Sequence, residues 1–259
     1  MARVLKLSGS MEEFSLEKLR RSVAKAGEEV GVDVDGRINI SIDRDVHSWE
    51  LADLVQLELL RGAIDRPELA EVAKAHLLGR IYKEVFGRAR VTVEEYRHLA
   101  GVGPEFDRAL SYSALRLFTN GNYALRSGAK LVETPAMAVA RVARAVARDG
   151  EWAGRYLALI TELKLVPASP FWFNAGTRRE MFASCFTLEV EDCLSSLTHH
   201  GMQCIYDALT YSGVIQQLGG GVGYDFSLLR PEGDVVKGSV GVASGPVSFM
   251  KLFDANVEV

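Results

Sequence analysis

The sequence predicts a mainly α N-terminal region followed by the start of an α/β region. Apolar residues recur at helical spacing in several segments before residue 165. After Pro167 the pattern changes to short strands, glycines and helices, and residues 182–190 alternate with a period of two. We therefore expect three domains, at residues 1–90, 91–165 and 166–259.

The bulk composition is that of a soluble globular protein. The chain has 259 residues, 48% of them apolar and 25% charged, which gives room for a sizeable core. A net charge of −4 gives no electrostatic reason to expect nucleic-acid binding. No apolar run approaches the length of a membrane span, and the N-terminus has no secretion signal. We expect a cytoplasmic protein with no membrane partner.

The first 90 residues predict a small domain with one hairpin and three helices. A turn at residues 8–10 separates two short strands, and Ser15 is expected to cap the first helix. The second helix follows Ser48, and the third spans about residues 67–86 with a proline in its first turn. Residues 38–42 alternate weakly between apolar and polar residues.

Residues 91–165 are expected to be helical and structural. Thr134 is predicted to cap one helix, Pro135 to begin it and Gly150 to end it. Arg141, Arg144 and Arg148 form a polar stripe on this helix, which we interpret as a solvated face.

The alternation over residues 182–190 predicts a strand with Cys185 on the face opposite its apolar residues. The pattern leaves two interpretations open, a reactive thiol or a small buried hydrophobe. Gly219 to Gly223 fit neither a dinucleotide fingerprint nor a P-loop, so they form a tight turn or allow close approach of a ligand. A helix is expected over residues 198–217, and a loop or short strand pair over residues 235–242.

The three cysteines have no CxxC spacing and are too few for a disulfide scaffold, which favours a reducing compartment. We interpret Cys193 and Cys204 as packing residues. His199 and His200 are adjacent and would diverge on any regular element, so we expect no histidine–cysteine metal site.

Several motifs, in this order, resemble the large catalytic subunit of ribonucleotide reductases. They are Ser169-Pro170, Asn174-Ala175-Gly176-Thr177, Ser184-Cys185, the glycine cluster, Arg230-Pro231 and Ser244-Gly245-Pro246 with Phe249-Met250. The resemblance implies the first part of a ten-stranded α/β barrel. It also implies radical chemistry that replaces the ribose 2′-OH of a ribonucleotide with hydrogen. Cys185 matches the first cysteine of a redox pair that becomes a transient disulfide, restored by a thioredoxin or glutaredoxin-type reductant.

The resemblance also implies two groups of binding residues. The substrate-binding positions are Ser169, Ser184, Cys185, Gly220 and Gly221. The specificity-effector positions, where a deoxynucleotide selects the substrate base, are Asp192, Arg230, Val236 and Lys237. In the family that effector site lies at a subunit interface, which implies a homodimer.

The N-terminal region resembles an ATP-cone, a regulatory module that binds ATP or dATP. The resemblance rests on Val4-Leu5-Lys6, Gly9-Ser10, Glu12-Glu13-Phe14 and Lys18-Leu19. It implies nucleotide contacts from Lys6, Glu12, Ser15, Lys18, Arg21, Ser48 and Lys83. Lysine and arginine suit phosphates, and a carboxylate can accept hydrogen bonds from adenine or ribose.

The segment from Leu110 to Pro135 is similar to the lead-in of the adenosylcobalamin-dependent class, which implies adenosylcobalamin as cofactor. An iron- or manganese-dependent partner subunit is the alternative source of the radical. The resemblance places the radical cysteine and the second redox cysteine on later strands, so we expect no turnover without the remaining catalytic part.

Two other functions compete with this interpretation. One is a nucleotide-sensing regulatory protein with an ATP-cone, which predicts a zinc ribbon with paired CxxC motifs that this sequence lacks. The other is a soluble α/β nucleotide-binding domain of unrelated function.

Overall fold

The computed structural model describes residues 2–6, 8–34, 38–99, 101–121, 123–179, 181–198, 203–236 and 241–258, with only the backbone of residues 97–99. The chain divides into two compact units, Met1–Pro167 and Ala168–Val259. Each unit has its own cluster of buried apolar side chains.

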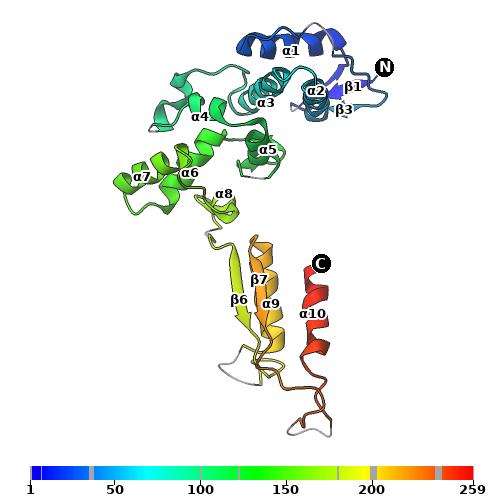
Figure 1. Ribbon diagram of the computed structural model, residues 1–259, viewed down its shortest axis with the longest axis vertical. Helices are drawn as coiled ribbons and strands as arrows, with labels where there is room; N and C mark the ends of the chain where they lie inside the picture. The colour runs from blue at the N-terminus through cyan, green and yellow to red at the C-terminus, as the bar shows by residue number, and fades with distance from the viewer. Residues whose placement is uncertain are drawn as a thin grey trace. The chain divides into compact units, whose positions relative to one another are not determined.

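The first unit begins with a small sheet and three helices. Strand β1 (Arg3–Leu5) pairs antiparallel with β2 (Met11–Glu13) and parallel with β3 (Val46–His47). Helices α1 (Leu16–Val30) and α2 (Ser48–Gly62) both pack on α3 (Leu69–Phe86), as Figure 1 shows. The expected hairpin and three helices are confirmed, and the third helix begins two residues after Pro67.

Local sequence signals explain the first helix. The Ser15 hydroxyl accepts a hydrogen bond from the Lys18 N–H at 3.3 Å, which confirms the predicted cap. Gly31 ends the helix in the left-handed conformation, with φ of 70°. The weak alternation over residues 38–42 corresponds to a segment whose Ile38 and Ile40 are buried against the helices, and its described residues form no strand.

The rest of the first unit is mainly helical. Its elements are η1 (Val93–Leu99), α4 (Pro104–Ala109), α5 (Tyr112–Asn120), β4 (Arg126–Ser127), β5 (Lys130–Leu131), α6 (Pro135–Val146) and α7 (Gly150–Thr161). Thr134 caps α6 as predicted. The expectation that Gly150 ends this helix is wrong, because Gly150 begins α7 after Asp149, whose side chain accepts from the Trp152 N–H at 2.9 Å.

One arginine of the predicted solvated stripe points inward. The Arg141 side chain is 14% exposed and its Nη2 lies 2.7 Å from a carboxylate oxygen of Glu133. The same Glu133 accepts from the Leu125 N–H at 2.8 Å. The interpretation as a solvated face is therefore wrong for Arg141, which joins α6 to the segment before β4.

A buried carboxylate fixes the start of α6. Asp107 is fully buried and accepts hydrogen bonds from the Tyr96 hydroxyl at 2.6 Å and the Ala136 N–H at 2.7 Å. The Tyr96 hydroxyl also lies 3.1 Å from the Thr134 hydroxyl. Burial raises the pKa of Asp107 to about 6, because water no longer stabilises its charged form.

The second unit is a parallel strand pair with helices. Its elements are α8 (Ser169–Asn174), β6 (Cys185–Glu189), α9 (Ile205–Gln217), β7 (Gly221–Asp225) and α10 (Pro246–Glu258). Helix α9 forms the crossover between β6 and β7 (Figure 1), as in a βαβ unit. Such a pair is compatible with the expected start of an α/β barrel, and the strands in the described part of the chain do not close one.

Two boundaries in the second unit refine the predictions. Helix α9 begins at Ile205, later than the expected Thr198, and residues 199–202 lie outside the described part. Val235 and Val242 form an isolated antiparallel bridge, which confirms a short strand pair. None of the helices among the described residues is both long and apolar enough to cross a bilayer.

Candidate functional site

Strand β6 presents Cys185 to solvent. Its side chains alternate as predicted, with Cys185, Thr187 and Glu189 exposed and Phe186 and Leu188 turned inward. The Cys185 thiol is free and exposed, so the interpretation as a small buried hydrophobe does not hold in this chain. The parallel register places Cys185 opposite Gly221 on β7.

The two predicted glycines have different surroundings. The Gly221 N–H donates to the Ser184 carbonyl at 2.7 Å, and the residue is exposed beside the thiol. Gly220 is buried, and a Cβ there would lie 2.7 Å from Ile215 Cγ2 and 3.0 Å from Phe186 Cε2. Packing against α9 therefore explains Gly220, whereas Gly221 leaves open space for a ligand.

Helix α8 is held against the same end of the strand pair. The Asn174 side-chain amide donates to the Met181 carbonyl at 2.7 Å and the Leu218 carbonyl at 3.5 Å. Phe171 stacks on Phe182 with their ring centroids 5.2 Å apart. These contacts bring the helix that begins with Ser169 next to the segments that carry Ser184 and the glycines.

The predicted effector residues gather at the other end of β6. A carboxylate oxygen of Asp192 lies 2.6 Å from Arg230 Nε, and Arg230 Nη1 donates to the Val235 carbonyl at 3.1 Å. Val236 follows directly, and Lys237 lies outside the described residues. Because β6 is five residues long, the two groups of residues are separated by roughly 16 Å of strand.

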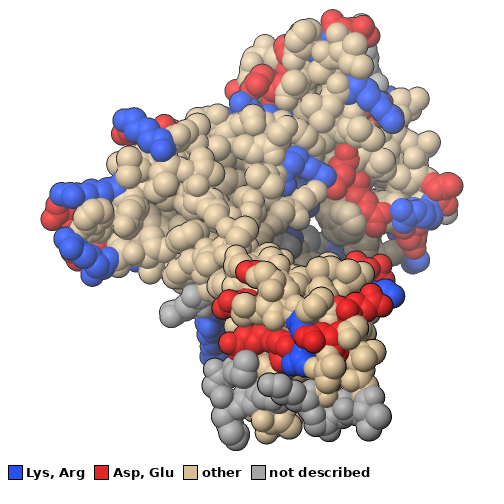
Figure 2. All heavy atoms as spheres, turned by 60° about the horizontal axis from the view of Figure 1, so that its bottom comes forward, with Lys and Arg blue, Asp and Glu red and all other residues tan. Residues whose placement is uncertain are grey.

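The second unit as a whole is acidic. Residues 168–259 include 10 Asp or Glu and only 5 Lys or Arg. Figure 2 shows acidic side chains crowded on the face of this unit that is turned to the viewer. Arg230 carries a positive charge within this group, and that charge is paired with Asp192.

The N-terminal candidates also come together in part. Lys6 Nζ and Lys18 Nζ lie 3.2 and 3.3 Å from the Glu12 carboxylate. These two lysines, Lys6 first, hold the pKa of Glu12 below its ordinary value. Leu5 pairs with His47, and Ser48 follows His47 directly in the sequence.

The remaining cone candidates sit elsewhere on the three helices. Arg21 lines a cavity of about 520 Å³ along α1 together with Glu17 and Glu28. Lys83 belongs to the last turn of α3. The Ser15 hydroxyl already accepts a hydrogen bond from the Lys18 N–H as the cap of α1.

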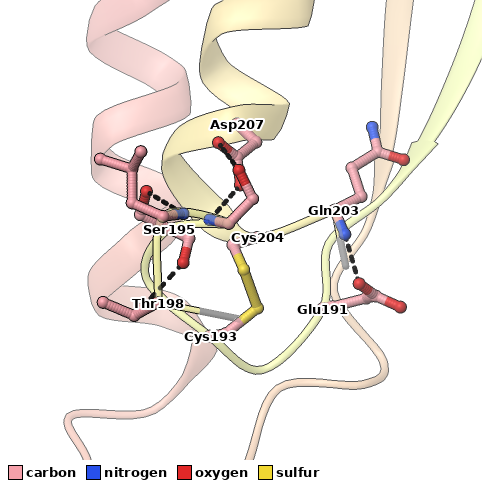
Figure 3. The surroundings of a disulfide bond; sticks show 9 residues. Glu191, Cys193, Ser195, Thr198, Gln203, Cys204 and Asp207 are labelled. Atoms are coloured by element: carbon pink, nitrogen blue, oxygen red, sulfur yellow. Dashed lines mark hydrogen bonds between the residues drawn. A yellow bond between two sulfur atoms is a disulfide. The ribbon is translucent and has the colours of Figure 1, made fainter. Parts of the chain in front are cut away.

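The interpretation of Cys193 and Cys204 as packing residues is wrong. They are buried but form a disulfide with each other, with their Cα atoms 4.9 Å apart (Figure 3). The parallel bridge between Glu191 and Cys204 brings the two cysteines together. Their spacing in the sequence gave no signal of this, because the bridge depends on the β6–α9 connection folding back on itself.

The described residues contain no group of three or more His, Cys, Asp and Glu side chains that could hold a metal ion. The predicted absence of a His199–His200 metal site falls on residues outside the described part.

Comparison with known families decides the identity. The family model "Ribonucleotide reductase, all-alpha domain" matches residues 108–180, and "Ribonucleotide reductase, barrel domain" matches residues 183–259. Together they cover more than half of the chain. The chain belongs to the ribonucleotide reductase large-subunit family. The barrel match covers Ser184, Cys185, the glycine cluster and Arg230.

Individual reductases are similar over longer stretches. The vitamin B12-dependent ribonucleoside-diphosphate reductase of Mycobacterium tuberculosis (strain CDC 1551 / Oshkosh) is 29% identical over 98% of this chain and 36% of its own length. The enzyme of that name from Thermoplasma acidophilum is 40% identical over 42% of this chain and 13% of its own length. The ribonucleoside-diphosphate reductase large subunit of monkeypox virus is 30% identical over 58% of this chain. The chain thus spans about a third or less of the length of these relatives.

Proposed function

We propose that this chain is the N-terminal part of the catalytic subunit of a ribonucleoside-diphosphate reductase. The observation that carries the proposal is the free, exposed thiol of Cys185 on β6, beside Gly221 and the Ser184 carbonyl. The names of the relatives support the diphosphate as substrate.

In the proposed reaction Cys185 is one of two thiols that supply the reducing equivalents. The ribose 2′-OH leaves as water and C2′ gains a hydrogen. The two thiols together lose two electrons and two protons and become a disulfide, which a dithiol protein then reduces. The second thiol and the radical cysteine belong to later strands of the barrel.

The exposed backbone at Gly221 leaves room for the substrate. Because glycine has no side chain, a ligand can approach the strand closely there, while the Gly221 N–H itself donates to the Ser184 carbonyl. Ser184 and Ser169, held near it by the contacts of Asn174, would contribute hydroxyl groups. Gly220 would support this turn by packing, because Ile215 and Phe186 fill the space beside it.

Two regulatory nucleotide sites complete the proposal. A deoxynucleotide effector would bind near Asp192, Arg230 and Val236, with Lys237 adjacent in sequence and a second subunit completing a homodimer. ATP or dATP would bind the N-terminal cone at Lys6, Glu12 and Lys18, which already lie in contact.

Adenosylcobalamin is the radical source that the relatives' names favour. Among the described residues, the cavity of about 520 Å³ is lined by the first unit alone, and Cys185 lies on an open strand face. These residues do not form a cobalamin site by themselves. No step of the proposal therefore passes through the cofactor.

Cys185→Ser in the full-length reductase tests the proposal. We expect repeated turnover with a dithiol reductant to be lost, because the variant cannot form the disulfide. Thr187→Ser is the matched control, since Thr187 lies on the same exposed face of β6. Deoxynucleotide formation at the unmodified rate in Cys185→Ser would refute the assignment.

A further inference from the structure

The β6–α9 connection carries a second pair of sulfur atoms that the proposed reaction does not use. Cys193 and Cys204 are joined by a disulfide and are 7% and 0% exposed. Cys185, by contrast, is a free and exposed thiol. The chain therefore holds two classes of cysteine with different access to a reductant.

Backbone hydrogen bonds tie both ends of this connection together around the disulfide. The Ile205 N–H donates to the Cys193 carbonyl at 3.0 Å, and the Tyr206 N–H donates to the Leu194 carbonyl at 3.0 Å. On the other side, the Glu191 N–H donates to the Gln203 carbonyl at 3.0 Å. The crosslink thus closes a segment whose two ends already pair.

Side chains next to both cysteines make contacts that depend on the crosslinked conformation. The Asp207 carboxylate, in the first turn of α9, accepts from the Ser196 N–H at 2.7 Å and from its hydroxyl at 3.0 Å (Figure 3). Asp192 directly precedes Cys193 and contacts Arg230 at 2.6 Å. Fixing Cys193 to the N-terminus of α9 therefore limits the movement of Asp192.

We propose that Cys193 and Cys204 form a redox-sensitive latch that holds residues 191–196, Asp192 among them, against the N-terminus of α9. Reduction by a dithiol breaks the S–S bond. The dithiol gives up two electrons and two protons and becomes a disulfide, while both cysteines become thiols. Reoxidation by a disulfide-bearing protein closes the latch again.

The burial of both cysteines sets the order of events. A reductant reaches the bond only after the connection opens locally, whereas it reaches Cys185 directly. The latch is therefore expected to stay closed under reducing conditions that keep Cys185 as a thiol.

Thiol counting on the full chain tests the first half of the proposal. The protein is purified without reductant, alkylated under native conditions, and its intact mass and peptides are measured. We expect one alkyl group, on Cys185, and a crosslinked peptide pair containing Cys193 and Cys204. Alkylation of all three cysteines in the untreated protein would overturn the proposal.

Hydrogen exchange tests the second half without any nucleotide, so its outcome is independent of the proposed effector site. After treatment with excess dithiothreitol, amides of residues 191–196 are expected to exchange about tenfold faster. The double variant Cys193→Ser/Cys204→Ser should show fast exchange with or without dithiothreitol, while Cys185→Ser should respond as the unmodified protein does. Unchanged exchange of this segment in the reduced protein would show that the disulfide is not a latch.

Discussion

Gly220 and Gly221 are adjacent in sequence but offer a matched pair of perturbations. In Gly220→Ala the new methyl group would lie 2.7 Å from Ile215 Cγ2, 3.0 Å from Phe186 Cε2 and 3.3 Å from the Ile215 carbonyl oxygen. In Gly221→Ala the one near contact is the Ser184 carbonyl oxygen at 3.4 Å, which is ordinary van der Waals distance. The first substitution forces β6 and α9 to shift, and the second does not.

The expected magnitudes follow from these distances. Overpacking a filled interior costs about 1–3 kcal/mol, whereas a substitution that meets open space changes stability by about 0.5 kcal/mol or less. For a chain of this size each 1 kcal/mol lowers the Tm by roughly 2–4 °C. We therefore expect Gly220→Ala to lower the unfolding temperature by roughly 2–12 °C and Gly221→Ala to leave it nearly unchanged.

The assay compares thermal unfolding of the two variants with that of the unmodified protein by circular dichroism. Binding of a ribonucleoside diphosphate to the full-length reductase is then measured for each variant that stays folded. Gly221→Ala is expected to weaken this binding, because its methyl group occupies the open space beside Cys185. Equal unfolding temperatures for the two variants would refute the packing argument for Gly220.

Three further predictions concern the first unit and the regulatory sites. Burial raises the Asp107 pKa from 3.8 to about 6, so the stability that the protonated carboxyl contributes is full below about pH 4 and is lost as the pH rises through about 6. Asp107→Asn should abolish this fall of about 3 kcal/mol in the free energy of unfolding. Parallel pH profiles of the unfolding free energy for the variant and the unmodified protein would contradict this prediction. Lys6→Ala should weaken ATP and dATP binding about tenfold in calorimetry, with Arg3→Ala as control, and no binding heat in the unmodified protein would rule out the cone site. Arg230→Ala should weaken binding of a deoxynucleotide effector about tenfold compared with Lys251→Ala, and an unchanged affinity would show that the effector does not bind near Asp192.

Features encoded over a few neighbouring residues could be predicted. The cap at Ser15 and the start of α6 after Thr134 depend on side chains that reach their own backbone, so the local sequence suffices. The alternation on β6 likewise fixed which side of the strand Cys185 occupies. The prediction for Gly150 was wrong because glycine often ends a helix, although Asp149 before it is an equally local signal for the start of a new helix.

Features that join distant segments could not be predicted. Nothing in the sequence distinguishes the inward Arg141 from its exposed neighbours until Glu133 is placed beside it. The residues next to Asp107 in the sequence do not indicate that it is buried, because Tyr96 and Ala136, which donate hydrogen bonds to it, belong to other elements. The pairing of Cys193 with Cys204 requires the β6–α9 connection to fold back.

The sequence by itself therefore determined the order of elements, the motifs that resemble a reductase, and the face of β6 on which Cys185 lies. Its exposure came from the structure. Only the tertiary structure decided that Gly220 is a packing residue while Gly221 is open, and that Asp192 meets Arg230. It also decided that two of the three cysteines are crosslinked. The physical reason is that capping and strand alternation act between near neighbours, whereas burial and pairing depend on which distant side chains fill the adjoining space.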